Sequence, residues 1–238
     1  MRIGLNLIAT NKYFYFVPKI LESIEKFFFI NDDVTILIHT NMDTGNIISS
    51  RNNINIIKNE IKHEPWPFTT LKRFHYFSNS KIQMCECEII FYIDVDSIFI
   101  GPIESSVLSK DGIFATLHPC LFQGEGTPER NPRSKAFIPI GSNNKYFCGG
   151  FFGGFKKEFY EMCEKIKEDI DSDLRDNYIA IWHDESHLNR FLYENPPSLI
   201  LEPPFAVAEN ITQSFKESKI IFLDKQKMGG HLFFRDNI

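Results

Sequence analysis

Two aspartates interrupt an otherwise apolar stretch of the chain. The sequence IIFYIDVDSIFIG, residues 89–101, places Asp94 and Asp96 between two runs of large hydrophobic side chains. Burying carboxylates is costly unless other groups compensate their charge. In an extended strand, side chains two residues apart point to the same side, so both carboxylates would be presented together if the strand is still extended there.

The aspartate pair has two interpretations, and the motif alone leaves both open. Hard divalent cations such as Mn²⁺ and Mg²⁺ prefer oxygen ligands, and they often bridge a carboxylate to phosphate oxygens. In the first interpretation, Asp94 and Asp96 hold such an ion on a diphosphate. In the second, they lie at a strand end and simply reach water. The D-x-D pattern is short and common by chance, so it does not choose between them.

A second acidic segment, WHDESHLN, places His183 and His187 four residues apart. The zinc metalloprotease pattern is H-E-x-x-H, whereas here the glutamate, Glu185, comes one position late. A zinc hydrolase is therefore not expected, and the residue types alone make both histidines polar residues of a helix. By the same reasoning, the glycines of CGGFFGG are turn or bulge residues, and Trp66 belongs to the core.

The bulk composition excludes several classes of function. A net charge of -5 argues against a general nucleic-acid binder, which would show a basic face. The five cysteines are scattered and form no pair of C-x-x-C motifs, which argues against structural zinc and favours a reducing compartment. No apolar segment has the length of a membrane span, and the start of the chain lacks a signal-peptide cleavage pattern. We expect a soluble, cytoplasmic protein with no membrane span.

Strand and helix patterns alternate along the chain, which predicts an α/β fold with a mixed, mostly parallel central sheet flanked by helices. Ligand sites in such sheets lie beyond the carboxyl ends of the strands, where Asp94 and Asp96 are expected. No G-x-G-x-x-G follows the first strand and no G-x-x-x-x-G-K-[ST] occurs, which removes the usual dinucleotide and P-loop interpretations. We expect strands at 3–9, 34–40, 54–58, 89–101 and 112–119, helices at 15–28, 69–85, 156–171 and 183–193, and a long loop over 122–145.

Five motifs occur in a fixed order along the chain: EPWPFTTLKRF, FYIDVDSIF, TLHP, YFCGGFFGG and WHDESHLNRFL. Together they resemble the glycosyltransferase family that contains the histo-blood-group A and B transferases and the α1,3-galactosyltransferases, glycosyltransferase family six. The resemblance runs from IGLNLIATNKY to about Pro203. Eukaryotic members carry a membrane anchor and stem that this sequence lacks, so it looks like a short prokaryotic or viral member.

The resemblance implies a GT-A fold in a single domain, with a nucleotide-binding half at about 1–100 and an acceptor-binding half at about 101–238. It implies transfer of galactose or N-acetylgalactosamine (GalNAc) from a UDP-sugar to the 3-hydroxyl of a galactoside glycan, possibly fucosylated, with retention. Retention needs a nucleophile on the far face of the sugar, or a front-face route with a carboxylate that stabilises positive charge. The sequence does not choose between these routes, and it leaves the oligomeric state open.

The resemblance also assigns roles to individual residues. Asp94 and Asp96 match the motif that holds Mn²⁺ (or Mg²⁺) on the UDP diphosphate, and Glu185 matches the catalytic carboxylate. Gly150 matches a position where a small residue leaves room for the N-acetyl group, which favours UDP-GalNAc over UDP-Gal. The other donor positions are Ile8, Thr10, Tyr13, Arg73, Val95, Cys148, Gly149, Asp184 and the tail residues Lys225, Lys227 and Arg235, and the acceptor positions are His118, Thr127, Trp182 and Glu185.

Two rival functions use the same residues differently. A UDP-sugar hydrolase would need water in place of an ordered acceptor site. A non-catalytic carbohydrate-binding module would carry a degenerate donor site, against which the intact D-x-D pair and Glu185 argue. Likewise, the basic tail from Phe222 is either a source of positive charge for a departing phosphate or a solvated chain end.

Overall fold

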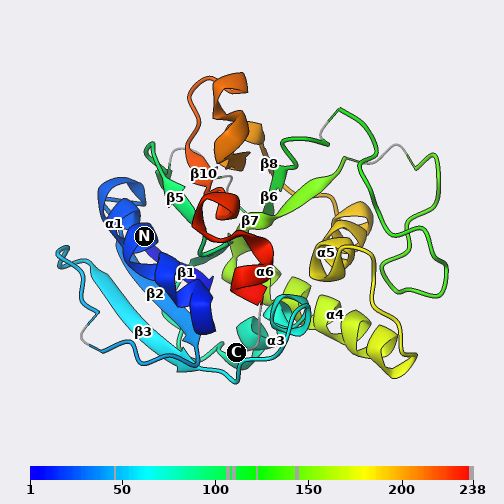
Figure 1. The fold of residues 1–238 in the computed structure, drawn as a ribbon, viewed down its shortest axis with the longest axis horizontal. Coiled ribbons are helices and arrows are strands. Elements are labelled where there is room, and N and C mark those ends of the chain that lie inside the picture. The colour runs from blue at the N-terminus through cyan, green and yellow to red at the C-terminus, as the bar shows by residue number, and fades with distance from the viewer. Residues whose placement is uncertain (46, 106–107, 109–110, 122, 143–144, 236–238) are drawn as a thin grey trace.

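A seven-stranded sheet runs through the centre of the molecule, in the strand order β3-β2-β1-β4-β7-β6-β8 (Figure 1). The computed structural model describes residues 1–235 apart from 46, 106–107, 109–110, 122 and 143–144. Strands β3, β2, β1 and β4 are parallel, and β7 is antiparallel to both of its neighbours. The predicted α/β fold with a mixed, mostly parallel sheet is confirmed. The strands of this sheet are β1 (Arg2–Ile8), β2 (Asp33–Thr40), β3 (Ile54–Glu60), β4 (Ile89–Ile93), β6 (Ile113–Leu117), β7 (Phe147–Phe155) and β8 (Leu199–Leu201).

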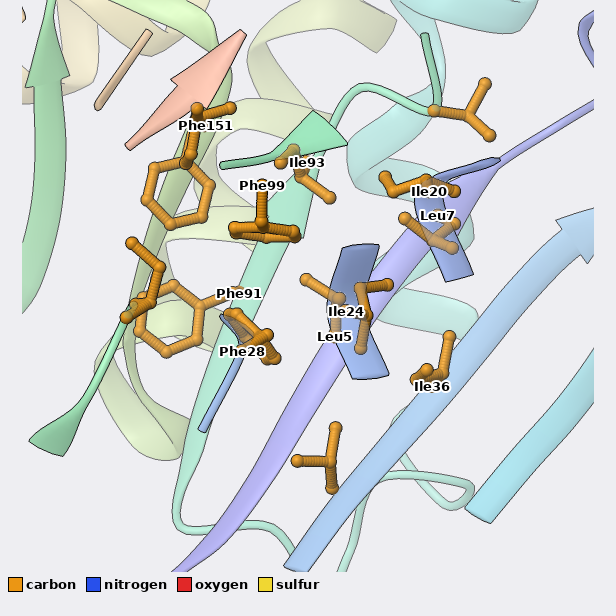
Figure 2. Close-up of a cluster of buried hydrophobic side chains, with 14 of the residues drawn as sticks. Leu5, Leu7, Ile20, Ile24, Phe28, Ile36, Phe91, Ile93, Phe99 and Phe151 are labelled. Carbon is orange, nitrogen blue, oxygen red and sulfur yellow. The ribbon is translucent and has the colours of Figure 1, made fainter. Parts of the chain in front are cut away.

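Helices cover both faces of this sheet, which is why β4 is apolar and buried at every position. On one face, Ile20 and Ile24 of α1 pack in the same cluster as Phe91 of β4 (Figure 2). On the other face, the ring of Tyr92 lies 5.2 Å from that of Phe77 in α3. The α-helices are α1 (Val17–Phe27), α2 (Phe68–Leu71), α3 (Arg73–Asn79), α4 (Lys156–Arg175), α5 (His183–Glu194) and α6 (Gly230–Arg235), and the 3-10 helices are η1 (Asn11–Phe16), η3 (Pro203–Phe205), η4 (Glu209–Ser214) and η5 (Lys225–Met228).

The single strand predicted over 89–101 is wrong. Strand β4 ends at Ile93, and the chain turns through 94–96 before β5 (Ser97–Phe99). Strand β5 belongs to a second sheet of three strands, in which β10 (Ile220–Phe222) lies between it and β9 (Val207–Ala208). The Ser97 hydroxyl donates to the Asp94 carbonyl at 2.5 Å, which stabilises the turn. The two aspartates therefore lie around a turn, and strand alternation does not set their directions.

Two other segments differ from their predicted form. The helix expected over 69–85 is two short helices that end at Asn79, because the Ser80 hydroxyl donates to the Tyr76 and Phe77 carbonyls and competes with further helix. The glycines of CGGFFGG lie within β7 and not in a turn, but the pairing of β7 with β6 shifts register between Phe147 and Phe152, so the bulge interpretation holds for Gly149 and Gly150. A Cβ at Gly153 would lie 2.6 Å from the Ile90 carbonyl oxygen, so glycine permits the close approach of β7 to β4.

The segment 122–145 has no helix or strand among the residues that the structure describes, as expected for a long loop. It is anchored through buried carboxylates. Glu129 accepts from the backbone N–H of Ile181 at 2.8 Å, and Asp173 of α4 accepts from the Ser134 hydroxyl at 2.5 Å. Across the described ranges, no helix is both long and apolar enough to cross a membrane.

Candidate active site

A cavity of about 550 Å³ opens beyond the carboxyl ends of β1 and β4. This is where an open α/β sheet is expected to bind its ligand. Its wall is formed by α3, β7, α5 and the C-terminal segment, which are far apart in the sequence. It brings together these predicted residues: Ile8, Thr10, Tyr13, Arg73, Asp94, Val95, Asp96, Cys148, Gly149, Gly150, Trp182, Asp184, Glu185, Lys225 and Arg235.

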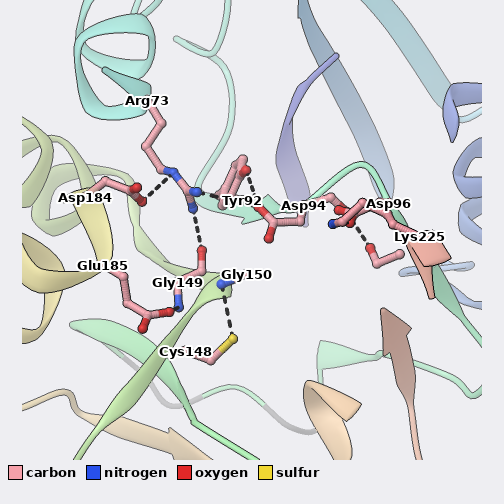
Figure 3. A network of polar contacts seen from close by, with 11 residues as sticks. Arg73, Tyr92, Asp94, Asp96, Cys148, Gly149, Gly150, Asp184, Glu185 and Lys225 are labelled. Atoms are coloured by element: carbon pink, nitrogen blue, oxygen red, sulfur yellow. Dashed lines mark hydrogen bonds and ion pairs between the residues drawn. The ribbon is translucent and has the colours of Figure 1, made fainter. Parts of the chain in front are cut away.

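Arg73 is the buried centre of the polar network (Figure 3). Its Nε atom lies 2.7 Å from Oδ2 of Asp184, and its Nη1 donates to the Gly149 carbonyl at 2.5 Å. Its Nη2 lies 3.6 Å from Oδ1 of Asp94, and the guanidinium stacks 4.5 Å from the ring centre of Tyr92. Burial opposes the charge, but the acidic neighbours outweigh it and raise the pKa of Arg73 above its usual value. One permanently charged group therefore links α3, α5, β7 and the acidic turn.

The paired aspartates face separate cations, and these cations compensate the cost of burying the two carboxylates. Asp94 accepts a hydrogen bond from the Tyr92 hydroxyl at 2.5 Å and faces Arg73. Asp96 forms an ion pair with Lys225, whose side chain is largely buried (Figure 3). Burial opposes the charge of Lys225, while Asp96 counteracts this, and the net effect raises the pKa of the lysine. The alternative in which both carboxylates reach only water is wrong.

The pair also fits a divalent cation that is shared with a ligand. Such ions at nucleotide sites use one or two carboxylates and complete their coordination with phosphate oxygens and water. Asp94 and Asp96 both line the cavity and supply oxygen donors of this type. Within the described residues, no three His, Cys, Asp or Glu side chains converge as a metal site. The donor set therefore suits an ion held jointly with a diphosphate, and does not suit one enclosed by protein alone.

Glu185 lies in the first turn of α5 and receives a donor on each carboxylate oxygen. Oε1 accepts from the Tyr146 hydroxyl and Oε2 from the Gly149 backbone N–H, both at 2.8 Å. Burial, reinforced by Glu185, raises the pKa of Tyr146, so the phenol stays protonated and remains a donor. These two bonds fix the direction of the carboxylate against β7.

Three of the four predicted acceptor residues, His118, Thr127 and Glu185, contact Tyr146. Trp182 lines the cavity and is about half exposed. His118 and Thr127 lie outside the cavity lining, but the His118 ring is 5.8 Å from that of Tyr146, and the Thr127 side chain is hydrogen-bonded to the same tyrosine. Tyr146 thus connects His118 and Thr127 to Glu185. The sequence analysis gave it no role, although it is the first residue of the motif YFCGGFFGG, which was the available signal.

The C-terminal segment lies across the cavity and contacts a residue that was assigned to the core. Helix α6 lies in front of the central strands (Figure 1), and its Arg235 stacks 4.3 Å from the ring centre of Trp66. Trp66 is 46% exposed, lines the cavity and meets His183 edge-on at 4.9 Å. The core assignment of Trp66 is wrong, because its indole is held between two polar side chains at the cavity.

One predicted donor residue lies elsewhere. Lys227 is 61% exposed and pairs with Glu209 at 2.7 Å, and it does not line this cavity. Other lining residues had no assignment from the sequence. His63 follows β3 and its Nδ1 contacts the Thr10 hydroxyl at 3.0 Å, so its place after a strand end was the available signal. The remaining unassigned lining residues are Glu64, Thr69, Thr70, Tyr92, Ile181, His183, Phe222 and Phe234.

Comparison with known proteins decides the family. The model described as Glycosyltransferase family 6 matches residues 1–231. The chain belongs to glycosyltransferase family 6. This confirms the family resemblance drawn from the five ordered motifs, and the sheet and its flanking helices are those of a GT-A type glycosyltransferase.

Mammalian and bacterial relatives align with this chain. It is 29% identical over 210 residues to histo-blood group ABO system transferase 1 of Rattus norvegicus. This alignment covers 85% of this chain and 60% of the relative. It is 28% identical over 235 residues to globoside alpha-1,3-N-acetylgalactosaminyltransferase 1 of Homo sapiens, covering 94% and 67%. It is 26% identical over 234 residues to the O-antigen biosynthesis glycosyltransferase WbnI of Escherichia coli, covering 95% and 96%. The chain thus spans about three fifths of the rat relative and nearly all of the bacterial one.

Proposed function

We propose that this glycosyltransferase moves GalNAc, and less readily galactose, from a UDP-sugar to the 3-hydroxyl of a galactoside, with retention and with Mn²⁺ or Mg²⁺. One observation carries the proposal: the acidic pair, the buried cations and the separately oriented Glu185 share a single cavity. Residues of about 1–100 would form the nucleotide-binding half and the rest the acceptor-binding half, with Lys225 and Arg235 reaching back to the donor. The printed name of the human relative, an N-acetylgalactosaminyltransferase, supports the donor class.

The donor side is built to stabilise a departing diphosphate. Breaking the sugar–phosphate bond places negative charge on an oxygen of UDP, and a cation held by Asp94 and Asp96 would supply Lewis acidity there. Lys225 and Arg235 line the same cavity and provide further positive charge. Lys225 is tied to Asp96 in this structure, so it lies beside the position where the diphosphate would bind.

Glu185 would act on the transferred sugar. The transferred sugar develops positive charge at its reacting carbon, and a carboxylate fixed beside it stabilises that charge or attacks it. The donors from Tyr146 and Gly149 hold the carboxylate in one direction, and Arg73 ties Gly149 to Asp184. Such preorganisation removes the cost of reorienting the groups during reaction.

An activity screen tests the proposal. The purified chain is incubated with UDP-GalNAc or UDP-Gal, with lactose or a fucosylated galactoside, and with Mn²⁺ or EDTA. We expect a trisaccharide or tetrasaccharide with a new α-1,3 linkage, formed faster from UDP-GalNAc. Free sugar formed at the same rate with and without acceptor would indicate a hydrolase, and failure to bind UDP would indicate a binding module.

Replacing Tyr146 with phenylalanine is expected to lower kcat by about 10- to 100-fold, because a hydrogen bond to a charged group contributes about 1.5–3 kcal/mol. The affinity for UDP should stay unchanged, since Tyr146 touches the carboxylate and not the nucleotide side. Steady-state kinetics with calorimetric titration of UDP measures both. The control is Tyr160→Phe on α4, away from the cavity. Equal kcat for Tyr146→Phe and wild type would remove this positioning role.

Binding of UDP with Mn²⁺ is expected to slow amide hydrogen exchange in residues 222–235. Lys225 and Arg235 lie on this segment and would gain phosphate partners, while the segment already rests on Trp66 and Tyr13. Closure of such a segment excludes water from the reaction. Mass spectrometry measures the exchange, with α4 as an internal reference. Unaltered exchange across the segment at saturating UDP would contradict closure.

A further inference from the structure

We propose that Phe222 limits the space for the 2-substituent of the donor sugar, acting together with Gly150. This inference rests on the proposed function, and it assigns a specificity role to a residue that the sequence analysis left without one. The sugars compared differ at that position, where galactose carries a hydroxyl and GalNAc carries a larger acetamido group. The size of the space over Gly150 therefore decides between them.

The space beside Gly150 is already occupied. A Cβ atom built on Gly150 would lie 2.6 Å from Cε1 and 2.7 Å from Cζ of Phe222, and 3.1 Å from Oδ2 of Asp94. The missing side chain of Gly150 thus opens onto the edge of an aromatic ring and not onto free volume. The Phe222 ring therefore takes up part of the room that Gly150 leaves for an acetamido group.

The backbone around Phe222 is fixed relative to the donor site. Phe222 ends β10, where it pairs with Ser97 of β5. The next residue, Leu223, donates its N–H to the Asp96 carbonyl at 2.8 Å. The ring itself lines the same cavity as Asp94 and Gly150, and it is only partly buried. Its base is therefore held by strand pairing, while its outer edge faces the space that the sugar would enter.

This arrangement changes what Gly150→Ala would do. Overlap with Phe222 means that the added methyl group presses on the ring, so the substitution acts through Phe222. We expect Gly150→Ala to weaken the use of both donors, and we expect a smaller residue at 222 to relieve it. If Gly150 acted alone, the substitution would lower the use of UDP-GalNAc only, and residue 222 would have no influence on the result.

The test compares kcat/KM for UDP-GalNAc and UDP-Gal in wild type, Phe222→Ala, Phe222→Leu, Gly150→Ala and Gly150→Ala/Phe222→Leu. Phe222→Ala is expected to raise the GalNAc-to-Gal ratio about 10-fold, with a smaller rise for Phe222→Leu. The double variant is expected to recover much of the activity that Gly150→Ala loses with each donor. Calorimetric titration of both donors gives the ratio of their dissociation constants, which shows whether the discrimination already exists in binding. The control is Phe205→Leu, another partly buried phenylalanine that packs on the same core cluster but lies outside the cavity.

The outcomes distinguish the role of Phe222 from the transfer reaction itself. A GalNAc-to-Gal ratio that stays at the wild-type value, or falls, in both Phe222 variants would overturn this inference while leaving the transfer reaction intact. The same holds if Phe222→Leu fails to relieve Gly150→Ala, or if Phe205→Leu shifts the ratio as much. Absence of transfer by the wild-type chain with any donor and acceptor would overturn the proposed function itself, and this inference with it.

Discussion

Glu185→Gln is expected to lower the rate of sugar transfer about 10³-fold while leaving UDP affinity within about twofold. The substitution keeps the size of the side chain but removes the negative charge that would face the developing positive charge of the sugar. It also introduces an amide NH₂ at one of two positions that now accept hydrogen bonds from Tyr146 and Gly149. Placed against Tyr146, this NH₂ donates to the hydroxyl oxygen, while the amide oxygen still accepts from the Gly149 N–H, so the side chain keeps its orientation and the variant isolates the loss of charge.

Single-turnover kinetics and calorimetric titration of UDP measure the two quantities separately. Glu194→Gln is the matched control, since Glu194 ends the same helix and pairs with Arg190 at the surface. Turnover by Glu185→Gln close to that of the wild type would refute the catalytic assignment. A comparable loss of UDP affinity would instead move Glu185 to a binding role.

Replacing Asp94 and Asp96 together by asparagine is expected to weaken Mn²⁺-dependent binding of UDP by more than about 100-fold. The ion would lose both of its charged protein ligands, and neutral amide oxygens bind a hard cation less well. The same change leaves Lys225 without its carboxylate partner and removes one of the two acids that face Arg73. We therefore expect binding of UDP in EDTA to persist or to strengthen, because the cavity becomes more positive.

Titration of each protein variant with UDP, once in the presence of Mn²⁺ and once in the presence of EDTA, separates these effects. A matched control is available on α4, where Asp169 and Asp171 have the same spacing and lie outside the cavity. Asp169→Asn/Asp171→Asn removes the same charge and should leave both titrations unchanged. Thermal unfolding of each variant shows whether the fold persists. Mn²⁺-dependent affinity equal to that of wild type in Asp94→Asn/Asp96→Asn would exclude the two aspartates as metal ligands.

The sequence predicted those features that depend on local pattern. The apolar runs of β1, β2 and β4 and the helical spacing of α4 and α5 are properties of neighbouring residues, and their positions hold within a few residues. The position of Asp94 beyond the end of a central strand followed from the same pattern. The ordered motifs then supplied most of the residues that line the cavity.

Features that depend on contacts between distant segments could not be predicted in this way. Asp96 and Lys225 are 129 positions apart, and nothing in either segment names the other as its ion-pair partner. Tyr146 reaches Glu185 across 39 positions, and Trp66 is covered by Arg235 from the far end of the chain. The turn at 94–96 was missed because apolar residues on both sides read as one strand, whereas pairing of β5 with β10 draws the second run into another sheet.

The three-stranded sheet has a consequence for biogenesis. Because β10 (Ile220–Phe222) follows every strand of the large sheet in the sequence, β5 lacks this partner while those strands are being synthesised. Domains emerge from the ribosome with their N-terminal parts first, and pairings between distant segments form slowly. A nascent chain that has exposed every strand of the large sheet would thus carry the two aspartates before Lys225 has been added, so the acidic side of the cavity is made before its C-terminal cation.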